Sequence, residues 1–131
     1  MPAGTFVYSN HYFAERNKGS IDWENDAIKC AIMDTGFTFN RDTHATYANV
    51  SASELANGNG YTTGGKTLQN VAVSEDDTND RSDVTADPDT WTASGGSIGP
   101  FAGFLYYDDT TGDDTVIGYL PVTTEETATD G

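Results

Sequence analysis

Basic residues are scarce in this sequence. Its 131 residues include only six Lys and Arg against 21 Asp and Glu, which gives a formal net charge of −15. A protein that binds nucleic acid regardless of base sequence needs a basic surface to displace the counterions of the phosphates. An anionic membrane surface repels an acidic chain for the same electrostatic reason. We therefore expect no nucleic-acid partner and no membrane partner.

Cysteine and long apolar stretches are scarce as well. No apolar run approaches the roughly 20 residues of a transmembrane helix, and we expect no secretory signal because no continuous apolar stretch follows residues 1–5. The single Cys30 has no second cysteine with which to form an internal disulfide. The lack of an internal disulfide agrees with synthesis in a reducing cytoplasm or with indifference to redox state. Because Cys30 lies in the apolar run 27–33, we expect a buried, unreactive thiol.

Aliphatic side chains are few, but aromatic side chains are not. Leu, Ile, Val and Phe make up 22 of the 131 residues, a fraction below the roughly 20% under which strongly charged chains are often disordered. Six Phe, seven Tyr and two Trp oppose disorder, since each aromatic ring buries a large area. The composition predicts one folded domain with a small core, rich in β structure.

The acidic residues are concentrated in the second half of the chain. Residues 1–74 carry a net charge of −2, and residues 75–131 carry a net charge of −13. In the second half the acids occur in clusters between short apolar or Thr-rich stretches. Because Asp favours turns and is depleted in strands, this pattern predicts strands joined by acidic turns. Residues 123–131 contain no apolar anchor, and we expect an acidic flexible tail there.

Hydrophobic periodicity predicts several strands. The run 27–33 places Ile28, Cys30 and Ile32 on one face with a period of two, which is typical of a half-buried strand. Ala, Lys and Met in the same run would also suit a short helix. Further strands are expected at residues 5–13, 68–74 and 84–91, and a hairpin at residues 103–107 and 115–120 around an acidic loop.

The sequence predicts a mainly β fold: a single antiparallel β-sandwich or barrel-like domain with one short helix. The helix is expected at residues 51–57, where Ser51 and Glu54 have the spacing of a capping box and Gly58 follows. A turn is expected around Trp23. The predicted core residues are Trp23, Ile28, Ile32, Val71, Val73, Trp91, Phe104, Leu105, Ile117 and Tyr119.

Two motifs resemble ligand sites but are interpreted as turns. Residues 60–67 match the phosphate-loop pattern G-x-x-x-x-G-K-[ST], yet residues 68–74 alternate like a strand where that loop requires a helix. Residues 76–83 have the composition of a calcium loop, but Arg81 occupies a position for a ligand or a glycine. We expect no catalytic residues, no cofactor, no metal site and no enzymatic activity.

Five sequence segments occur together in a specific order. They are Ile21-Asp-Trp-Glu-Asn-Asp-Ala-Ile-Lys29, residues 49–57 leading to Gly60-Tyr-Thr-Thr-Gly64-Gly65, Asp89-Thr-Trp-Thr-Ala-Ser-Gly-Gly-Ser-Ile-Gly99, Gly103-Phe-Leu-Tyr-Tyr-Asp-Asp109 and Ile117-Gly-Tyr-Leu120. In this order the chain resembles a family of small virion structural proteins of tailed bacteriophages over residues 20–120. The resemblance implies a structural role without catalytic residues. Members of that family tend to be less acidic and tend to end in a further strand.

The resemblance implies a virion location, and our leading hypothesis is a capsid decoration, or cement, protein that docks on the major capsid protein. A neck, tail-associated or fibre-anchoring protein is the alternative, and a carbohydrate-binding module that uses Trp91, Tyr106 and Tyr107 is a third. We expect residues 1–13 to form a docking arm, residues 14–122 the β-rich domain and residues 123–131 the tail. The predicted docking residues are Phe6, Tyr8, Tyr12 and Phe13. We expect the acidic loops to face outward and the protein to form a homotrimer.

Overall fold

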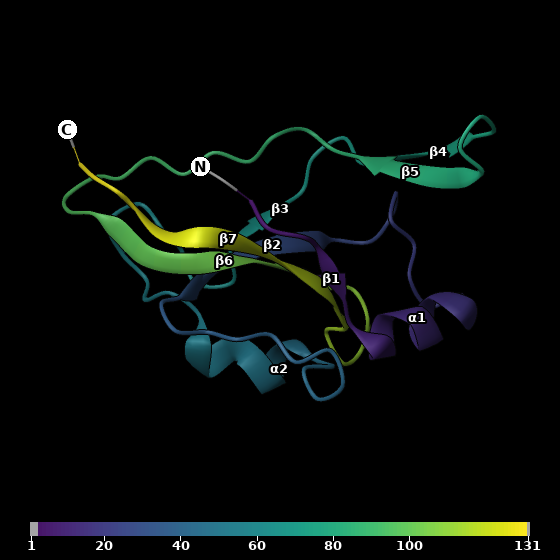
Figure 1. Ribbon diagram of the computed structural model, residues 1–131, viewed down its shortest axis with the longest axis horizontal. Helices are drawn as coiled ribbons and strands as arrows, with labels where there is room; N and C mark the ends of the chain where they lie inside the picture. The colour runs from purple at the N-terminus through teal and green to yellow at the C-terminus, as the bar shows by residue number, and fades with distance from the viewer. Residues whose placement is uncertain (1–2, 131) are drawn as a thin grey trace.

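An antiparallel sheet of five strands forms the centre of the protein. The computed structural model describes residues 3–130, and the sheet has the strand order β1-β7-β6-β2-β3 (Figure 1). These strands are β1 (Val7–Tyr8), β2 (Ile28–Asp34), β3 (Lys66–Thr67), β6 (Ile98–Asp108) and β7 (Val116–Ala128). A separate hairpin consists of β4 (Ala72–Asp76) and β5 (Arg81–Thr85), and the helical segments are α1 (Asn10–Asn17), α2 (Tyr47–Val50) and the 3-10 turn η1 (Ser51–Ser53). The strand pairs of the described residues are antiparallel, as the predicted mainly β fold requires.

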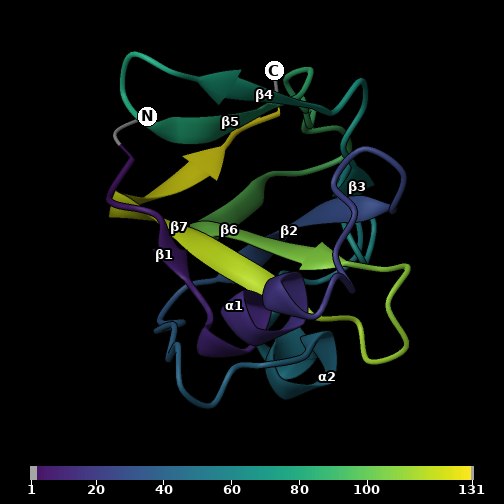
Figure 2. The same ribbon diagram turned by 90° about the vertical axis from the view of Figure 1, so that its right-hand side faces the viewer.

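The central sheet carries apolar side chains on both faces. On β2, Ala31 and Met33 pack in the cluster that includes Val50 of α2, whereas Cys30 and Ile32 point to the opposite face. Helix α2 lies against the first face, and the β4–β5 hairpin lies over the second (Figures 1 and 2). The strand predicted at residues 27–33 is confirmed, but it is not half-buried, because Ala31 and Met33 on its other face are buried as well. The arrangement is sandwich-like, with a second layer that consists of only two strands.

The β6–β7 hairpin has the position predicted from the sequence. Its pairing runs from Tyr107 opposite Val116 to Ile98 opposite Ala128. The acidic loop between the strands is held by its Thr and Asp side chains: the Thr110 amide donates to Asp108 Oδ1 at 2.9 Å, and the Thr115 amide donates to Thr111 Oγ1 at 2.9 Å. Asp and Thr in this loop therefore specify the turn.

The predicted strand at residues 5–13 is wrong beyond Tyr8. Strand β1 ends there, and helix α1 follows almost directly. Ser9 Oγ accepts a hydrogen bond of 2.9 Å from the Tyr12 amide, which satisfies one of the free N–H groups in the first turn of the helix. Residues 14–16 are Ala, Glu and Arg, which are good helix formers. Capping and these residues outweigh the β propensity of the aromatic residues.

The helix predicted at residues 51–57 lies nearer the N-terminus. Helix α2 begins at Tyr47, and only the short turn η1 falls within the predicted range. Glu54 does not cap the predicted helix, because its carboxylate accepts hydrogen bonds from the hydroxyl groups of Tyr47 and Tyr61 and from the Gly64 amide. No helix in the described part of the chain has the length and hydrophobicity that crossing a bilayer requires.

The C-terminal tail predicted at residues 123–131 is a strand over most of its length. Residues 123–128 belong to β7 and pair with the start of β6. Glu125 Oε2 also accepts a hydrogen bond of 2.8 Å from the Gly36 amide. Backbone pairing needs no apolar side chain, so the absence of an apolar anchor did not reveal this strand. Residue 131 lies outside the described residues.

Most of the predicted core residues are at least partly buried. The buried ones are Ile28, Ile32, Leu105, Ile117 and Tyr119. The half-buried ones are Trp23, Val71, Trp91 and Phe104. The prediction for Val73 is wrong, because this residue of the β4–β5 hairpin is 43% exposed. The predicted strands at residues 68–74 and 84–91 overlap β4 and β5 only in part.

Candidate binding groove

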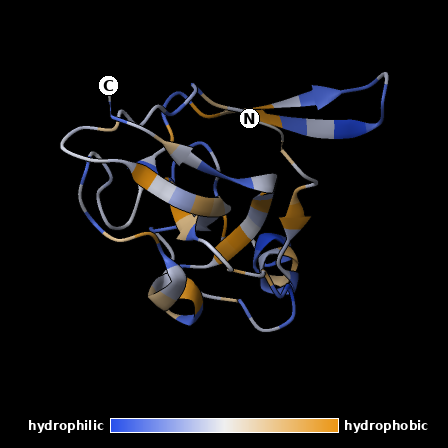
Figure 3. Ribbon diagram, turned by 60° about the vertical axis from the view of Figure 1, so that its left-hand side comes forward, coloured by the Kyte–Doolittle hydropathy of each residue, from blue (hydrophilic) through white to orange (hydrophobic). Residues whose placement is uncertain are grey.

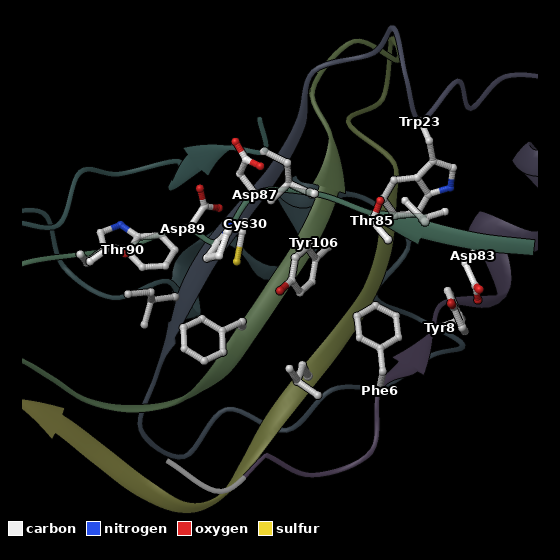
Figure 4. Close-up of a pocket in the computed structure, with 18 of the residues that line it drawn as sticks. Phe6, Tyr8, Trp23, Cys30, Asp83, Thr85, Asp87, Asp89, Thr90 and Tyr106 are labelled. Atoms are coloured by element: carbon white, nitrogen blue, oxygen red, sulfur yellow. The ribbon is translucent and has the colours of Figure 1, made fainter. Parts of the chain in front are cut away.

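A large open groove lies between the sheet and the β4–β5 hairpin. Its volume is about 1110 Å³. Figure 4 shows the Phe6 and Tyr106 rings on the sheet side of this space, and Asp87 and Asp89 on the chain segment that follows β5. The apolar floor consists of Phe6, Cys30, Ile32, Phe104, Tyr106 and Leu120. An apolar floor of this size next to an open space is characteristic of a binding surface.

Strand register and one glycine create the floor. Cys30 on β2 lies opposite Tyr106 on β6, and Tyr106 lies opposite Gly118 on β7. A Cβ atom on Gly118 would lie 2.5 Å from the Phe6 ring. Because Gly118 has no side chain, the Phe6 ring packs across β7 with its centre 5.7 Å from that of the Tyr106 ring. The first aromatic residue of the chain thereby joins the floor.

The opposite wall of the groove is the β4–β5 hairpin, which makes few contacts with the rest of the described chain. Strands β4 and β5 pair only with each other, and the hairpin is hydrophilic over most of its length (Figure 3). The Val73 amide donates a hydrogen bond of 3.0 Å to Glu24 Oε2, which is one of the few hydrogen bonds between the hairpin and the rest of the described chain. Val73 and Val84 line the groove but remain 43% and 40% exposed. The hairpin therefore stands over the floor without covering it.

Two of the three carboxylates that line the groove have partners. Asp83 Oδ1 lies 2.9 Å from Arg81 Nε, and the Asn70 side-chain amide donates to Asp87 Oδ2 at 2.6 Å. Both interactions involve neighbouring residues on the hairpin or at its base. These two carboxylates are thus satisfied by the chain itself.

Asp89 is the carboxylate without a partner. Its Oδ2 atom is buried and receives no hydrogen bond from any described residue. The nearby ammonium group of Lys66 instead donates to the Thr90 carbonyl and lies 5.4 Å from the centre of the Trp91 ring. Burial raises the pKa of Asp89, an effect that the positive charge of Lys66 opposes. The groove therefore contains one unsatisfied acceptor.

The structure brings the four predicted docking residues together. The Tyr8 ring lies 5.4 Å from the ring centres of both Tyr12 and Phe13, and Phe6 packs against Tyr8 at 4.8 Å. Phe6, Tyr8 and Tyr12 line one end of the groove. Their accessibility differs, since Tyr8 is 41% exposed and Tyr12 only 3%. Tyr8 is the member of this cluster that presents the most surface to a partner.

The predicted boundary after residue 13 does not separate an arm from the domain. Strand β1 pairs with β7, and the Gly4 amide donates to the Pro121 carbonyl at 2.7 Å. Ser9 is buried and donates its hydroxyl proton to the Val116 carbonyl. Residues 3–13 are therefore an integral part of the fold, while residues 1–2 lie outside the described residues.

The residues considered for carbohydrate binding lie on two different faces. Trp91 and Tyr106 line the groove, but Tyr107 is buried on the opposite side of the sheet, where its hydroxyl donates to the Gly64 carbonyl at 2.7 Å. The sequence did not reveal the groove as such, because an open apolar face and a covered one have the same alternating pattern. The sequence signal that could best have indicated the groove is the acidic, weakly apolar composition of β4 and β5, which lie over it.

The two ligand-like motifs form turns. Residues 60–65 lead into β3, so a strand follows the glycines and not a helix. Residues 76–83 contain the turn of the β4–β5 hairpin at 77–80, where Asp76 Oδ1 accepts hydrogen bonds from the Thr78 and Asn79 amides. The described residues contain no group of three or more His, Cys, Asp or Glu side chains that could hold a metal ion.

Two further titratable groups lie near the sheet. Asp108, at the end of β6, is completely buried, and its Oδ2 atom receives no hydrogen bond from an N–H or hydroxyl group of the described residues. Burial and a hydrogen bond with the Asp26 carboxyl group raise the pKa of Asp108 to about 7. Burial also raises the pKa of the Cys30 thiol to about 12, which agrees with the expectation of an unreactive cysteine.

Comparisons with protein-family models, with curated proteins and with solved structures find no match to this chain.

Proposed function

We propose that this protein is a non-enzymatic structural component of a tailed-phage virion, a decoration protein that docks on the lattice of the major capsid protein. The resemblance of residues 20–120 to small virion structural proteins provides the context. The observation that carries the proposal is the apolar groove of about 1110 Å³ between the sheet and the hairpin. A preformed, uncovered apolar surface gains free energy when a partner covers it.

The net negative charge and the apolar groove both suit a protein that is synthesised as a free subunit and binds to the capsid afterwards. A net charge of −15 keeps free copies apart in solution. A capsid lattice presents the same partner surface many times, so one groove per chain is sufficient for dense decoration. Covering the groove would stabilise the bound domain by mass action. Exposed acidic turns on the hairpin would then face the solvent.

A neck, tail-associated or fibre-anchoring protein could use the same groove. The two roles differ in copy number, because a decoration protein follows the capsid lattice and a neck protein follows the symmetry of one vertex. We expect the bound form to be a homotrimer on the capsid. The molecular mass of the free protein and of the complex released from particles tests whether the bound form is a trimer.

Mass spectrometry of purified particles tests the proposal. The phage that encodes this chain is expected to contain it in a copy number comparable to that of the major capsid protein. A copy number fixed by a single vertex would instead identify the neck or tail alternative. Absence of the chain from particles, or binding to a glycan panel without particle association, would overturn the virion proposal.

A further inference from the structure

The chemistry of the groove indicates what kind of partner fits it. The buried Oδ2 atom of Asp89 has no donor among the described residues. A half-buried carboxylate without a donor is unfavourable. Because Asp89 as a whole is only half-buried and lines the groove, a cation from outside the chain can approach its carboxylate and lower that cost. Asp83 and Asp87 already have partners. The groove therefore offers an apolar floor and, beside it, one acceptor for a positive charge.

The chain segment that contains Asp89 also has free backbone groups. Residues 86–93 belong to no strand, and residues 86–91 line the groove. The described residues provide no acceptor for the backbone N–H groups of residues 89–93, although the amides of Asp87 and Ser94 on either side are bonded. A chain segment outside any strand whose N–H groups are free can pair with a strand of another polypeptide.

We propose that the groove binds an extended, basic segment of a partner polypeptide, whose apolar side chains cover the aromatic floor and whose Lys or Arg pairs with Asp89. The inference rests on the proposed function, in which that partner is another virion protein. Alternation of side chains along an extended segment places apolar groups on one side and basic groups on the other. Such a segment covers the apolar floor and, at the same time, places a positive charge beside the Asp89 carboxylate.

Neither a second copy nor a small apolar molecule meets all these requirements. Two copies of a chain with net charge −15 repel each other, and the acidic second half would bring further carboxylates to Asp89. A small apolar molecule would cover the floor but would leave the N–H groups of residues 89–93 without acceptors. Charge complementarity favours a basic polypeptide.

Fluorescence anisotropy with labelled synthetic peptides tests the inference on the full chain. The first peptide alternates Val and Lys, and the matched peptide alternates Val and Glu. We expect the Lys peptide to bind and the Glu peptide not to bind. Loss of a charge-assisted hydrogen bond in Asp89→Asn should weaken binding of the Lys peptide by at least about tenfold. Asp77→Asn removes the same charge at the hairpin turn, outside the groove, and should change affinity by less than about twofold.

A second variant locates the bound peptide. Thr85 lines the groove from β5, so Thr85→Trp should fill part of the space and abolish binding of the Lys peptide. Urea unfolding of each variant checks that the domain is intact. Equal binding of the Glu peptide, or unchanged affinity in both Asp89→Asn and Thr85→Trp, overturns the inference. Binding of a neutral fatty alcohol in place of either peptide overturns it too.

Failure of this inference can be distinguished from failure of the virion proposal. If particles incorporate wild type and Asp89→Asn in equal amounts, the inference about the groove is wrong and the virion proposal stands. If the chain binds the Lys peptide through Asp89 but is absent from particles, the groove inference stands and the virion proposal is wrong.

Discussion

Among the described glycines, Gly65 has the least room for a side chain. It precedes β3, adopts φ = +80°, and a Cβ atom there would lie 1.9 Å from the Cys30 carbonyl oxygen. The backbone of the turn thus packs directly on β2, and any side chain would push β3 away from the sheet. The similarity of residues 60–67 to a phosphate loop follows from this packing, since glycines serve close backbone approach in both settings.

Gly65→Ala is expected to destabilise the domain by about 3 kcal/mol or more, because overpacking adds to the cost of a left-handed residue. Gly36 is a matched control: it has φ = +81° and nothing within 4 Å of its Cβ position. Gly36→Ala should cost only about 1–2 kcal/mol. Urea unfolding of both variants measures the difference, and equal losses would contradict the packing argument.

Asp108 makes stability depend on pH. Its pKa is about 7 in the folded protein and about 3.9 in an unfolded chain. Between these values the folded state binds a proton that the unfolded state has released. Unfolding therefore releases a proton, and the contribution of Asp108 to stability is lost as the pH rises through about 7. Wild type should be less stable to urea at about pH 8 than at about pH 5.

Asp108→Asn should weaken that pH dependence, since the amide resembles the protonated acid at every pH. Asp77→Asn removes one charge without touching the buried pair, and it controls for the general repulsion among the acidic residues. A wild-type stability that is constant or rises between the two pH values would refute the assignment. So would the same pH profile in Asp108→Asn and wild type.

Single residues of the groove were predictable to different degrees. The aromatic residues near the N-terminus are conspicuous in an acidic chain, and Phe6, Tyr8 and Tyr12 do line the groove. Asp89 gave no such signal, because it is one of fourteen acids in residues 75–131. Its unpaired oxygen arises only from the path of the segment that follows β5. Whether a carboxylate has a hydrogen-bond partner depends on the tertiary structure, so no local sequence pattern indicates it.

Among the elements, α1 shows how one capping residue decides a local structure. Ser9 accepts a hydrogen bond from the Tyr12 amide and donates one to the Val116 carbonyl, so it joins α1 to β7. Ser9→Ala removes both bonds from a buried position, and we expect a loss of about 2–3 kcal/mol. Ser94→Ala, at an exposed serine, should stay within about 0.5 kcal/mol. Denaturant unfolding compares the two, and equal small effects would argue against this role for Ser9.

The β4–β5 hairpin is expected to open independently of the central sheet. It pairs with no other strand, and its apolar residues Val73 and Val84 remain largely exposed. Elements with few buried contacts open at low free energy. Amide hydrogen exchange should therefore be at least about tenfold faster in β4 and β5 than in β2 and β6. Equally slow exchange in all four strands would show that the hairpin unfolds together with the sheet.

Strands with apolar residues on a two-residue period were predictable as elements. The β6–β7 hairpin falls into this group, because burial of one face produces the alternation that identifies a strand. β2 was recognised from Ile28, Cys30 and Ile32, although its other face is buried too. β7 was predicted only as far as Leu120, since its later residues pair through the backbone and carry polar side chains. The hairpin strands β4 and β5 were misplaced by several residues for a similar reason: neither packs an apolar face on the sheet.

At the scale of the whole molecule, antiparallel pairing and a small core follow from composition and turns, but the strand order does not. The order β1-β7-β6-β2-β3 places the strand nearest the C-terminus inside the sheet. Val7 on β1 lies opposite Tyr119 on β7. No pattern within β1 or β7 specifies this long-range partner, and so the sequence alone left the sheet order open.

The place of β7 between β1 and β6 also determines when the chain can fold during its synthesis. Before β7 leaves the ribosome, β1 has no partner and β6 has only β2, so the nascent chain exposes unpaired edges. A chain that ends after Asp114 should therefore remain sensitive to protease and lack the far-ultraviolet circular dichroism of a sheet. A protease-resistant truncated chain would show that β2 and β6 fold unaided. Folding thus waits for the last strand, and a stalled ribosome carries an aggregation-prone chain.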